Sequence, residues 1–83
     1  MLSLVPTLGQ RITQLREAKK MSIADLATAM GTGYQSVWDW ENDRRKTVEL
    51  DTLFKLAKGL STTIDLLLEG VDEGYESVRT TFR

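Results

Sequence analysis

One helix-start signal recurs along this chain and strongly limits the folds open to it. In four places, a residue with a side-chain hydroxyl is followed three positions later by a residue whose side chain can reach back to it. The four pairs are Thr7 with Gln10, Ser22 with Asp25, Thr32 with Gln35, and Thr62 with Asp65. After the second pair, apolar residues fall at i, i+3, i+4 and i+7, namely Ile23, Leu26, Ala27 and Met30. Gly31 follows, and its tolerance of positive φ predicts the end of that helix.

Four further helices are predicted by apolar residues at helical spacing. The first spans about residues 7–20, the third about 33–42, the fourth about 50–58 and the fifth about 63–69. The inward side of the fourth is expected to carry Leu50, Leu53, Phe54 and Ala57, with Leu56 and Leu60 beside them. No alternating run of β-branched residues predicts a strand. The predicted fold class is therefore all-α, a compact five-helix domain.

The predicted domain occupies residues 7–70, between an N-terminal arm at 1–6 and a C-terminal stretch at 71–83. In that stretch three apolar residues lie at i, i+3 and i+7, so it is either a short sixth helix or a frayed tail. The fifth helix carries a leucine whose neighbours already supply the inward packing. These apolar residues form the predicted contact of a homodimer: Leu66, Tyr75, Val78 and Phe82.

Composition excludes several functions. The 83 residues can bury one small core, and the chain has no cysteine and no histidine, which removes thiol nucleophiles, disulfides and most zinc sites. We therefore predict a protein that is not an enzyme, with no catalytic residue, metal, cofactor or small-molecule substrate. No apolar run approaches the roughly 20 residues of a membrane span, and the opening lacks the basic flank of a signal peptide. A cytoplasmic protein without membrane contact is expected.

The predicted third helix separates two kinds of side chain. Val37, Trp40 and Glu41 share one side, and Gln35, Asp39 and Asn42 lie on the other, with Trp38 on the flank between them. The first side is expected to face the core, with Trp40 as its anchor. The densest positive cluster of the chain, residues 44–46, follows this helix. With a net charge of −1, any attraction to nucleic acid depends on such local placement.

A short helix, a three-residue turn containing glycine, a second helix with polar side chains outward and a basic loop match the helix-turn-helix layout. The segments that carry the match are RITQLREAKKMSIADLATAMG, VWDWEN and LDTLFKLAKGLSTTIDLLLEG. Over about Gly9 to Gly70 the chain resembles the phage repressor/Cro family, also called XRE-like. This resemblance implies a lambda-repressor-like domain whose third helix enters the major groove of double-stranded DNA. It also implies a repressor that binds an inverted-repeat operator as a dimer.

The resemblance assigns roles to individual positions. The residues implied to reach base edges are Tyr34, Gln35, Trp38 and Asp39. Those implied to lie near phosphates are Ile23, Gly33, Ser36, Asn42, Arg44, Arg45 and Lys46. Arg16 and Glu41 occupy positions that pair between the first and third helices, and we expect a structural ion pair there. The analysis of helix faces independently turns Gln35 and Asp39 outward. An amide can donate and accept one hydrogen bond each, which matches adenine.

The sequence departs from the family pattern at several positions. Ile23 replaces a glutamine that contacts phosphate, so a contact there depends on backbone N–H groups. Asp43 replaces the glycine that follows the third helix and would bring negative charge toward DNA, and Val48 replaces a proline. Asp39 on the reading face could accept from cytosine but would be repelled by phosphates.

Two questions stay open at the level of sequence. Gln35 either reads a base or closes a cap with Thr32. Trp38 either contacts a thymine methyl or sugar edge, packs on the stem of a Lys or Arg, or binds a protein partner. The near-neutral charge, Asp39, Asp43 and Trp38 favour a second hypothesis, a helix-turn-helix fold used as a protein interaction module without specific DNA binding.

Overall fold

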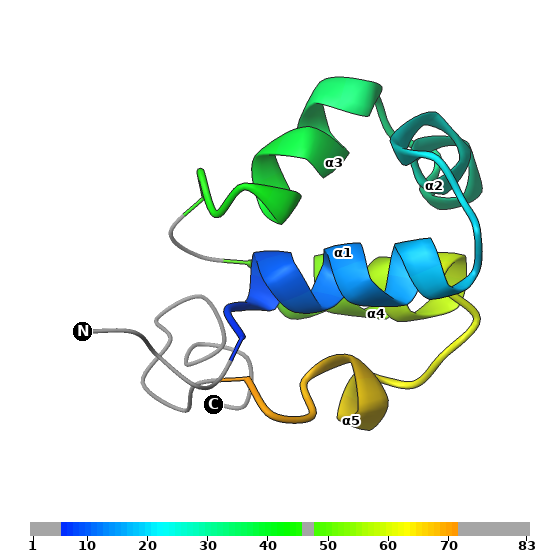
Figure 1. Ribbon diagram of the computed structural model, residues 1–83. Helices are drawn as coiled ribbons and strands as arrows, with labels where there is room; N and C mark the ends of the chain where they lie inside the picture. Colours follow the sequence, from blue (N-terminus) through cyan, green and yellow to red (C-terminus); the bar gives the residue numbers. More distant parts are fainter. Residues whose placement is uncertain (1–5, 46–47, 72–83) are drawn as a thin grey trace.

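The computed structural model describes residues 6–45 and 48–71, and this part of the chain contains helices and no strand. The helices are α1 (Leu8–Ala18), α2 (Ile23–Met30), α3 (Tyr34–Glu41), α4 (Leu50–Gly59) and α5 (Ile64–Leu67). Figure 1 shows α2 and α3 on one side of α1 and α4, with α5 on the opposite side. The all-α prediction is confirmed.

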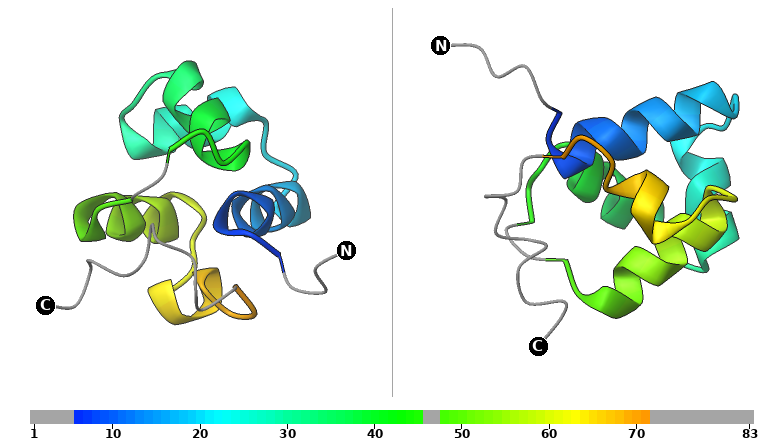
Figure 2. Two further views of the ribbon diagram at one scale, coloured as in Figure 1. Left: turned by 90° about the vertical axis from the view of Figure 1, so that its left-hand side faces the viewer. Right: turned by 90° about the horizontal axis from the view of Figure 1, so that it is seen from below.

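The core lies where α1 and α4 pass between the other helices, as the two views of Figure 2 show. Burial of aliphatic side chains from all five helices removes apolar surface from water and supplies most of the driving force for folding. The side chains that are fully buried are Leu8, Ile12, Leu26, Val37, Leu53, Leu56, Leu60 and Leu67. Val37 fixes the inward side of α3 in this core, so the opposite side of α3 faces away from the protein.

Two of the four predicted capping pairs form as expected. The Thr7 hydroxyl accepts from the Gln10 N–H, and the Gln10 side chain accepts from the Thr7 N–H. Ser22 and Asp25 make the same reciprocal pair at the start of α2. Gly31 ends α2 with φ of 72°, a left-handed conformation that glycine adopts without steric cost. These caps satisfy backbone donors that a helix start otherwise leaves unpaired.

The other two predicted pairs are wrong by one residue. The N-cap of α3 is Gly33, not Thr32, and it makes no side-chain cap hydrogen bond. Gln35 is consequently too early in the helix to reach back to the cap, which removes the capping alternative for its side chain. The N-cap of α5 is Thr63, not Thr62, and its hydroxyl accepts from the Leu66 N–H.

Phe54 corrects the prediction for the fourth helix. Its side chain is 58% exposed, whereas Leu53, Leu56, Ala57 and Leu60 are buried. These four residues lie at i, i+3, i+4 and i+7, and Phe54 falls about 100° away from Leu53 around the helix. The apolar residues of this segment allow two overlapping stripes, and packing against α2 and α5 selects the one that excludes Phe54.

Four helices also differ in length from the prediction, and α3 is one residue shorter at each end than the expected 33–42. The first ends at Ala18, because Lys19 takes the C-cap position and Lys20 has a positive φ of 58°. The fifth is reduced to Ile64–Leu67, and the fourth runs one residue further, to Gly59. The predicted roles of Lys46, Tyr75, Val78 and Phe82, and the arm at 1–5, lie outside the described residues. In the described part, no helix is long and apolar enough to span a membrane.

Candidate nucleic-acid interface

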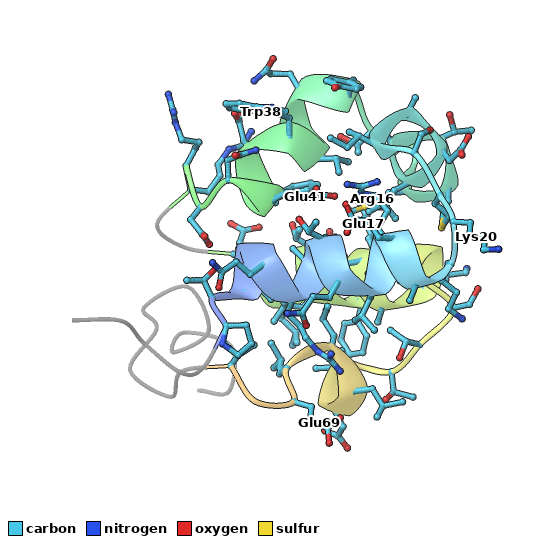
Figure 3. All side chains as sticks on the ribbon, viewed as in Figure 1. Arg16, Glu17, Lys20, Trp38, Glu41 and Glu69 are labelled. Carbon is cyan, nitrogen blue, oxygen red and sulfur yellow. The ribbon has the colours of Figure 1, made fainter. Side chains whose placement is uncertain are left out.

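A buried ion pair fixes the orientation of α3 on α1. The Arg16 Nε atom donates to Glu41 Oε2 at 2.6 Å, and Arg16 Nη2 donates to Glu41 Oε1 at 3.1 Å. This two-point contact joins the last turn of α1 to the last residue of α3 (Figure 3). The two side chains are only 12% and 5% exposed. The paired geometry expected from the sequence is therefore present, and its planar fork restrains rotation of α3 as well as its distance from α1.

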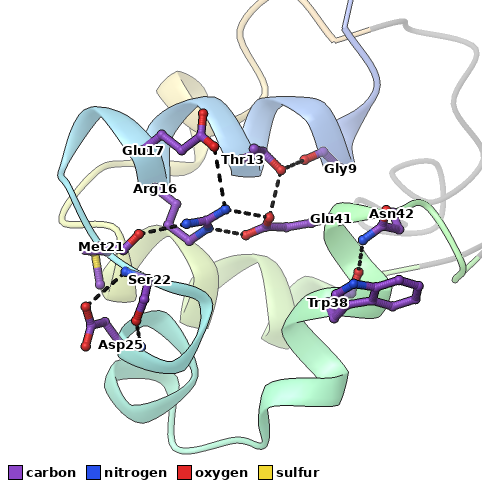
Figure 4. A network of polar contacts seen from close by, with 10 residues as sticks. All are labelled: Gly9, Thr13, Arg16, Glu17, Met21, Ser22, Asp25, Trp38, Glu41 and Asn42. Carbon is purple, nitrogen blue, oxygen red and sulfur yellow. Dashed lines mark hydrogen bonds and ion pairs between the residues drawn. The ribbon is translucent and has the colours of Figure 1, made fainter.

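Three further hydrogen-bond contacts, made by Thr13 and Arg16, extend this network, as Figure 4 shows. The Thr13 hydroxyl lies 2.8 Å from Glu41 Oε1 and 3.1 Å from the Gly9 carbonyl oxygen, so its single proton has an acceptor on either side. Arg16 Nη1 donates to the Met21 carbonyl oxygen at 2.7 Å, which ties the turn before α2 to the same guanidinium. The hydrogen bond to Glu41 raises the pKa of Arg16 above its usual value, although burial acts in the opposite direction.

A second anchor holds the end of α3 at the start of α1. Asp43 Oδ1 accepts from the Gly9 N–H at 3.1 Å, and Oδ2 accepts from the Thr7 hydroxyl at 2.6 Å. Asp43 takes a positive φ of 54°, which an aspartate tolerates better than most residues. Its carboxylate thus points at the positive end of the α1 dipole. These contacts engage both carboxylate oxygens within the protein, and the approach of this charge to DNA stays a prediction.

Gly9 lets the two helices approach closely. A Cβ atom at this position would lie 2.5 Å from the Glu41 carbonyl oxygen and 2.6 Å from that of Trp40. Both distances are shorter than any ordinary van der Waals contact, and both obstacles are backbone atoms that cannot turn aside. Glycine at position 9 is therefore a requirement of the α1–α3 packing.

The outward side of α3 carries the polar side chains that the sequence placed there. Gln35 is exposed, and its Nε2 atom donates to Asp39 Oδ1 at 3.0 Å. The other Asp39 oxygen, Oδ2, lies 3.5 Å from Arg45 Nη2. The exposed Asn42 donates through Nδ2 to the Trp38 carbonyl oxygen at 2.9 Å. Among residues 6–45 and 48–71 the chain leaves Gln35 and Asn42 exposed, so a ligand can reach them.

Both tryptophans have an arginine stacked on them. The Arg44 guanidinium carbon lies 5.5 Å from the centroid of the half-buried Trp38 ring. The Arg45 carbon lies 5.6 Å from that of Trp40, which is partly buried against the core and is not fully enclosed. Trp38 thus packs against an arginine, which is close to the second of its three alternatives, packing on the stem of a Lys or Arg. Each ring attracts the cation above it and holds it near the end of α3.

The remaining predicted contact residues fall into three places. Gly33 and Tyr34 are exposed at the start of α3, with Ser36 half-buried in its first turn. Ile23 begins α2, and its side chain packs partly against the core. The contact expected there is one from its backbone N–H group. Leu66 is 49% exposed on α5, on the other side of α1 and α4 from α3.

Sequence reasoning missed the contacts among these side chains. The Gln35–Asp39 bond follows from an i, i+4 spacing that was visible in the sequence. The Asp39–Arg45 pair and the Asp43 anchor had no comparable signal, because each depends on how the chain leaves α3. The basic residues were therefore predicted as a loop cluster, whereas two of them are positioned by tryptophan rings.

The arrangement of α2, the turn at 31–33 and α3 defines a helix-turn-helix domain, with α3 as its exposed second helix. The model of the helix-turn-helix family HTH_3 matches residues 12–67, and the chain belongs to this family. The predicted resemblance to the phage repressor/Cro type is thereby confirmed. No curated protein sequence matches the chain.

Solved structures agree with this assignment. The restriction-modification controller protein C.AhdI from Aeromonas hydrophila is 35% identical, with a TM-score of 0.68 over 72% of this chain and 89% of that one. SinR, a master regulator for biofilm formation solved in complex with DNA, is 27% identical, with a TM-score of 0.69 over 75% and 98%. The P22 c2 repressor, solved with a synthetic operator, is 28% identical, with a TM-score of 0.68 over 78% and 97%.

Proposed function

We propose that this protein is a sequence-specific regulator of transcription that binds double-stranded DNA, and that it acts as a repressor. The observation that carries the proposal is the outward side of α3, where Gln35 is exposed on a helix whose other side is locked to α1. The similarity to SinR and to the P22 c2 repressor, both solved in complex with DNA, supports the same assignment.

In the proposed complex α3 lies in the major groove, with Tyr34, Gln35, Trp38 and Asp39 toward the bases. The Gln35 amide offers the donor and acceptor that the major-groove edge of adenine requires. Arg44 and Arg45 supply positive charge beside the groove, since phosphates are contacted by cations without regard to sequence. Contacts from backbone N–H groups at Ile23 and Gly33, from Ser36 and Asn42, and from Lys46 would fix the register.

A homodimer is part of this proposal. Leu66 exposes an apolar side chain on α5, while Arg11 Nη2 donates to its carbonyl oxygen at 2.7 Å and holds the backbone in place. If a symmetric pair forms, two α3 helices that enter successive major grooves of one site would lie one helical turn apart, about 34 Å. An inverted repeat is the operator that such symmetry matches. Occlusion of a promoter by this dimer would repress transcription.

The test is selection from a random duplex library, followed by titration of the selected duplex at two salt concentrations. A regulator of this kind selects an inverted repeat, and its affinity falls steeply with salt because bound phosphates release counterions. Gln35→Ala relaxes preference at one base pair in each half-site, whereas Arg44→Ala weakens all sequences similarly. No enrichment of any duplex, or equal effects of Gln35→Ala on every sequence, would contradict the proposal.

A second candidate is an interaction module for another protein. The observation that favours it is the pair of aromatic residues on α3, Tyr34 at 55% exposure and Trp38 on the flank. Aromatic residues are enriched at the centres of protein interfaces. Capture of a protein partner that Trp38→Ala abolishes, together with no selected duplex, would support this candidate over the first.

A further inference from the structure

Three side chains on the outward side of α3 form one connected group. Gln35 Nε2 donates to Asp39 Oδ1 at 3.0 Å, and Asp39 Oδ2 pairs with Arg45 Nη2 at 3.5 Å. Both carboxylate oxygens of Asp39 are therefore engaged by the protein's own side chains. Asp39 is also the least exposed of these groups, with 23% of its side chain accessible against 46% for Arg45.

We propose that Asp39 is a positioning residue, which orients the amide of Gln35 for adenine and reads no base itself. The inference rests on the proposed function, since it concerns the same DNA-facing side of α3. It changes the role of Asp39 from a direct contact with a base edge to a contact made through Gln35.

The chemistry of the two groups fixes the direction of the amide. A carboxylate can only accept hydrogen bonds, so the Gln35 nitrogen and not its oxygen must face Asp39. One of the two N–H bonds of that nitrogen is used in this contact. The other N–H and the oxygen Oε1 remain on the free edge of the amide. One donor beside one acceptor is the pair that adenine N7 and N6 require.

Asp39 is poorly suited to reading a base directly. An oxygen of Asp39 that accepted from cytosine N4 would share its lone pairs with Gln35 or Arg45, and only 23% of the Asp39 side chain is accessible to such a donor. Gln35, by contrast, can bind adenine while it keeps its bond to Asp39. The Arg45 guanidinium also lies against Trp40, so a cation is held beside the carboxylate and offsets its repulsion of phosphates.

Loss of the Asp39 carboxylate removes what fixes the amide. The NH2 and the oxygen of the Gln35 amide are nearly the same size, and rotation of the amide by 180° exchanges the donor and the acceptor. A rotated amide matches adenine no better than other bases. Removal of Asp39 should therefore relax the preference at the base pair that Gln35 contacts, and at no other.

The experiment begins with the duplex that the wild-type protein selects from a random library. Affinities for this duplex and for every single base-pair change in one half-site are then measured for wild type, Gln35→Ala, Asp39→Ala and the double variant. Gln35→Ala identifies its base pair by a loss of discrimination of about tenfold. Asp39→Ala should lose about tenfold at the same base pair, and the double variant no more than about twofold beyond Gln35→Ala.

Two further variants separate positioning from charge. Asp39→Asn keeps the shape of the side chain but can present a donor or an acceptor to Gln35, so it no longer fixes the amide, and discrimination at the Gln35 base pair should fall by about tenfold, as in Asp39→Ala. Asp51→Ala is the matched control, because Asp51 on α4 also lies 3.5 Å from its cationic partner, Lys55. It removes one paired carboxylate from another helix and should leave the base preference unchanged. Thermal unfolding of each variant establishes that it is folded.

Several results would overturn the inference. If Asp39→Ala and Gln35→Ala relax different base pairs, or if their losses multiply in the double variant, Asp39 reads its own base. If Asp39→Asn changes the affinity for all duplexes equally and keeps the discrimination at the Gln35 base pair, the carboxylate acts through its charge and not by orienting the amide. An unchanged preference in Asp39→Ala also contradicts the inference. Failure of the wild type to select any duplex contradicts the proposed function itself, which makes the two failures distinguishable.

Discussion

The two sides of α3 carry similar polar chemistry in different surroundings. On the inward side, Glu41 accepts from Arg16 at two points and from Thr13, and its side chain is 5% exposed. On the outward side, Asp39 is likewise held by an arginine and by one uncharged side chain, but Arg45 is 46% exposed. Each side therefore has one carboxylate with one arginine, and burial is what separates them.

Burial determines what each group can do. A buried charge that loses its partner has no water to replace it, so the Arg16–Glu41 pair resists exchange and holds α3 in place. An exposed pair is weaker and loses little when water or a ligand replaces one partner. The inward contacts are thus suited to orientation and the outward contacts to recognition, although both use the same residue types.

The largest expected effect comes from breaking the inward pair. Glu41→Ala leaves the Arg16 guanidinium buried without its carboxylate and should lower the free energy of unfolding by about 3–5 kcal/mol. Urea denaturation followed by circular dichroism measures this change. The control is a double variant, Arg16→Leu with Glu41→Leu, which should cost less than Glu41→Ala because no charge is left unpaired. Equal losses in the two proteins would refute this account of the pair.

The next largest loss of stability is expected at Gly9, where α1 and α3 approach closely enough to keep Glu41 within reach of α1. Gly9→Ala should lower the free energy of unfolding by about 1–3 kcal/mol, because its Cβ would collide with backbone oxygens of α3. Gly33→Ala is the matched control, since no atom lies within 4 Å of its Cβ position, and it should cost less than about 1 kcal/mol. A smaller loss in Gly9→Ala than in Gly33→Ala would show that α3 can move aside freely.

A pH-dependent effect should arise from the exposed cap of α2. The backbone N–H of Ser22 donates to Asp25 and lowers the pKa of Asp25, with a further contribution from the Ser22 side chain. Because the pKa is lower in the folded state, this stabilisation is complete above the unfolded value of about 3.9 and is lost as pH falls through the folded value.

The variant Asp25→Asn should remove this part of the acid sensitivity. Denaturant unfolding at several pH values between about 2 and 7 should show a shallower loss of stability at the acid end than in wild type. Gln10→Ala serves as the comparison, because Gln10 closes the other capping pair without a titratable group. It should lower stability equally at all these pH values. Parallel pH curves for wild type and Asp25→Asn would contradict the assigned role of this carboxylate.

The smallest expected effect on stability is on the outward side of α3. Gln35→Ala and Asp39→Ala should change the free energy of unfolding by no more than about 0.5 kcal/mol, because the groups they remove are accessible to water. Thermal and urea unfolding of both variants measure this. A loss comparable to that of Glu41→Ala would abolish the distinction between an orienting side and a recognising side.

Much of the fold followed from local sequence signals. The capping pairs at Thr7 and Ser22 and the end of α2 at Gly31 depend on residues within one turn of each other, and all three were predicted. The cap of α3 was not, because Thr32 and Gly33 are both acceptable N-caps, and the turn geometry selects between them. Phe54 was misplaced because helical spacing alone allows two apolar stripes on α4.

The candidate site, like the fold, was predictable from the sequence only where local patterns determine it. Helical periodicity separated Val37 and Glu41 from Gln35 and Asp39, since that requires only the pitch of a helix. The partners of these side chains were less accessible. Asp43 accepts a hydrogen bond from the N–H of Gly9 at the start of α1, although the two residues are 34 positions apart in the sequence. No local pattern predicts such a contact. The placement of Arg45 depends likewise on a backbone path after α3 that residue types do not specify.

The contact at Gly9 has a consequence for how the orientation of α3 is inherited from α1. Position 9 sets the distance between α1 and the carboxyl end of α3, and it lies outside the residues proposed to touch DNA. A residue with a Cβ there would press on the backbone of α3 beside Glu41 and disturb the contact between Glu41 and Arg16, while it would change no side chain on the outward side of α3. The direction in which α3 presents its outward side thus depends on the absence of a single methyl group on a different helix.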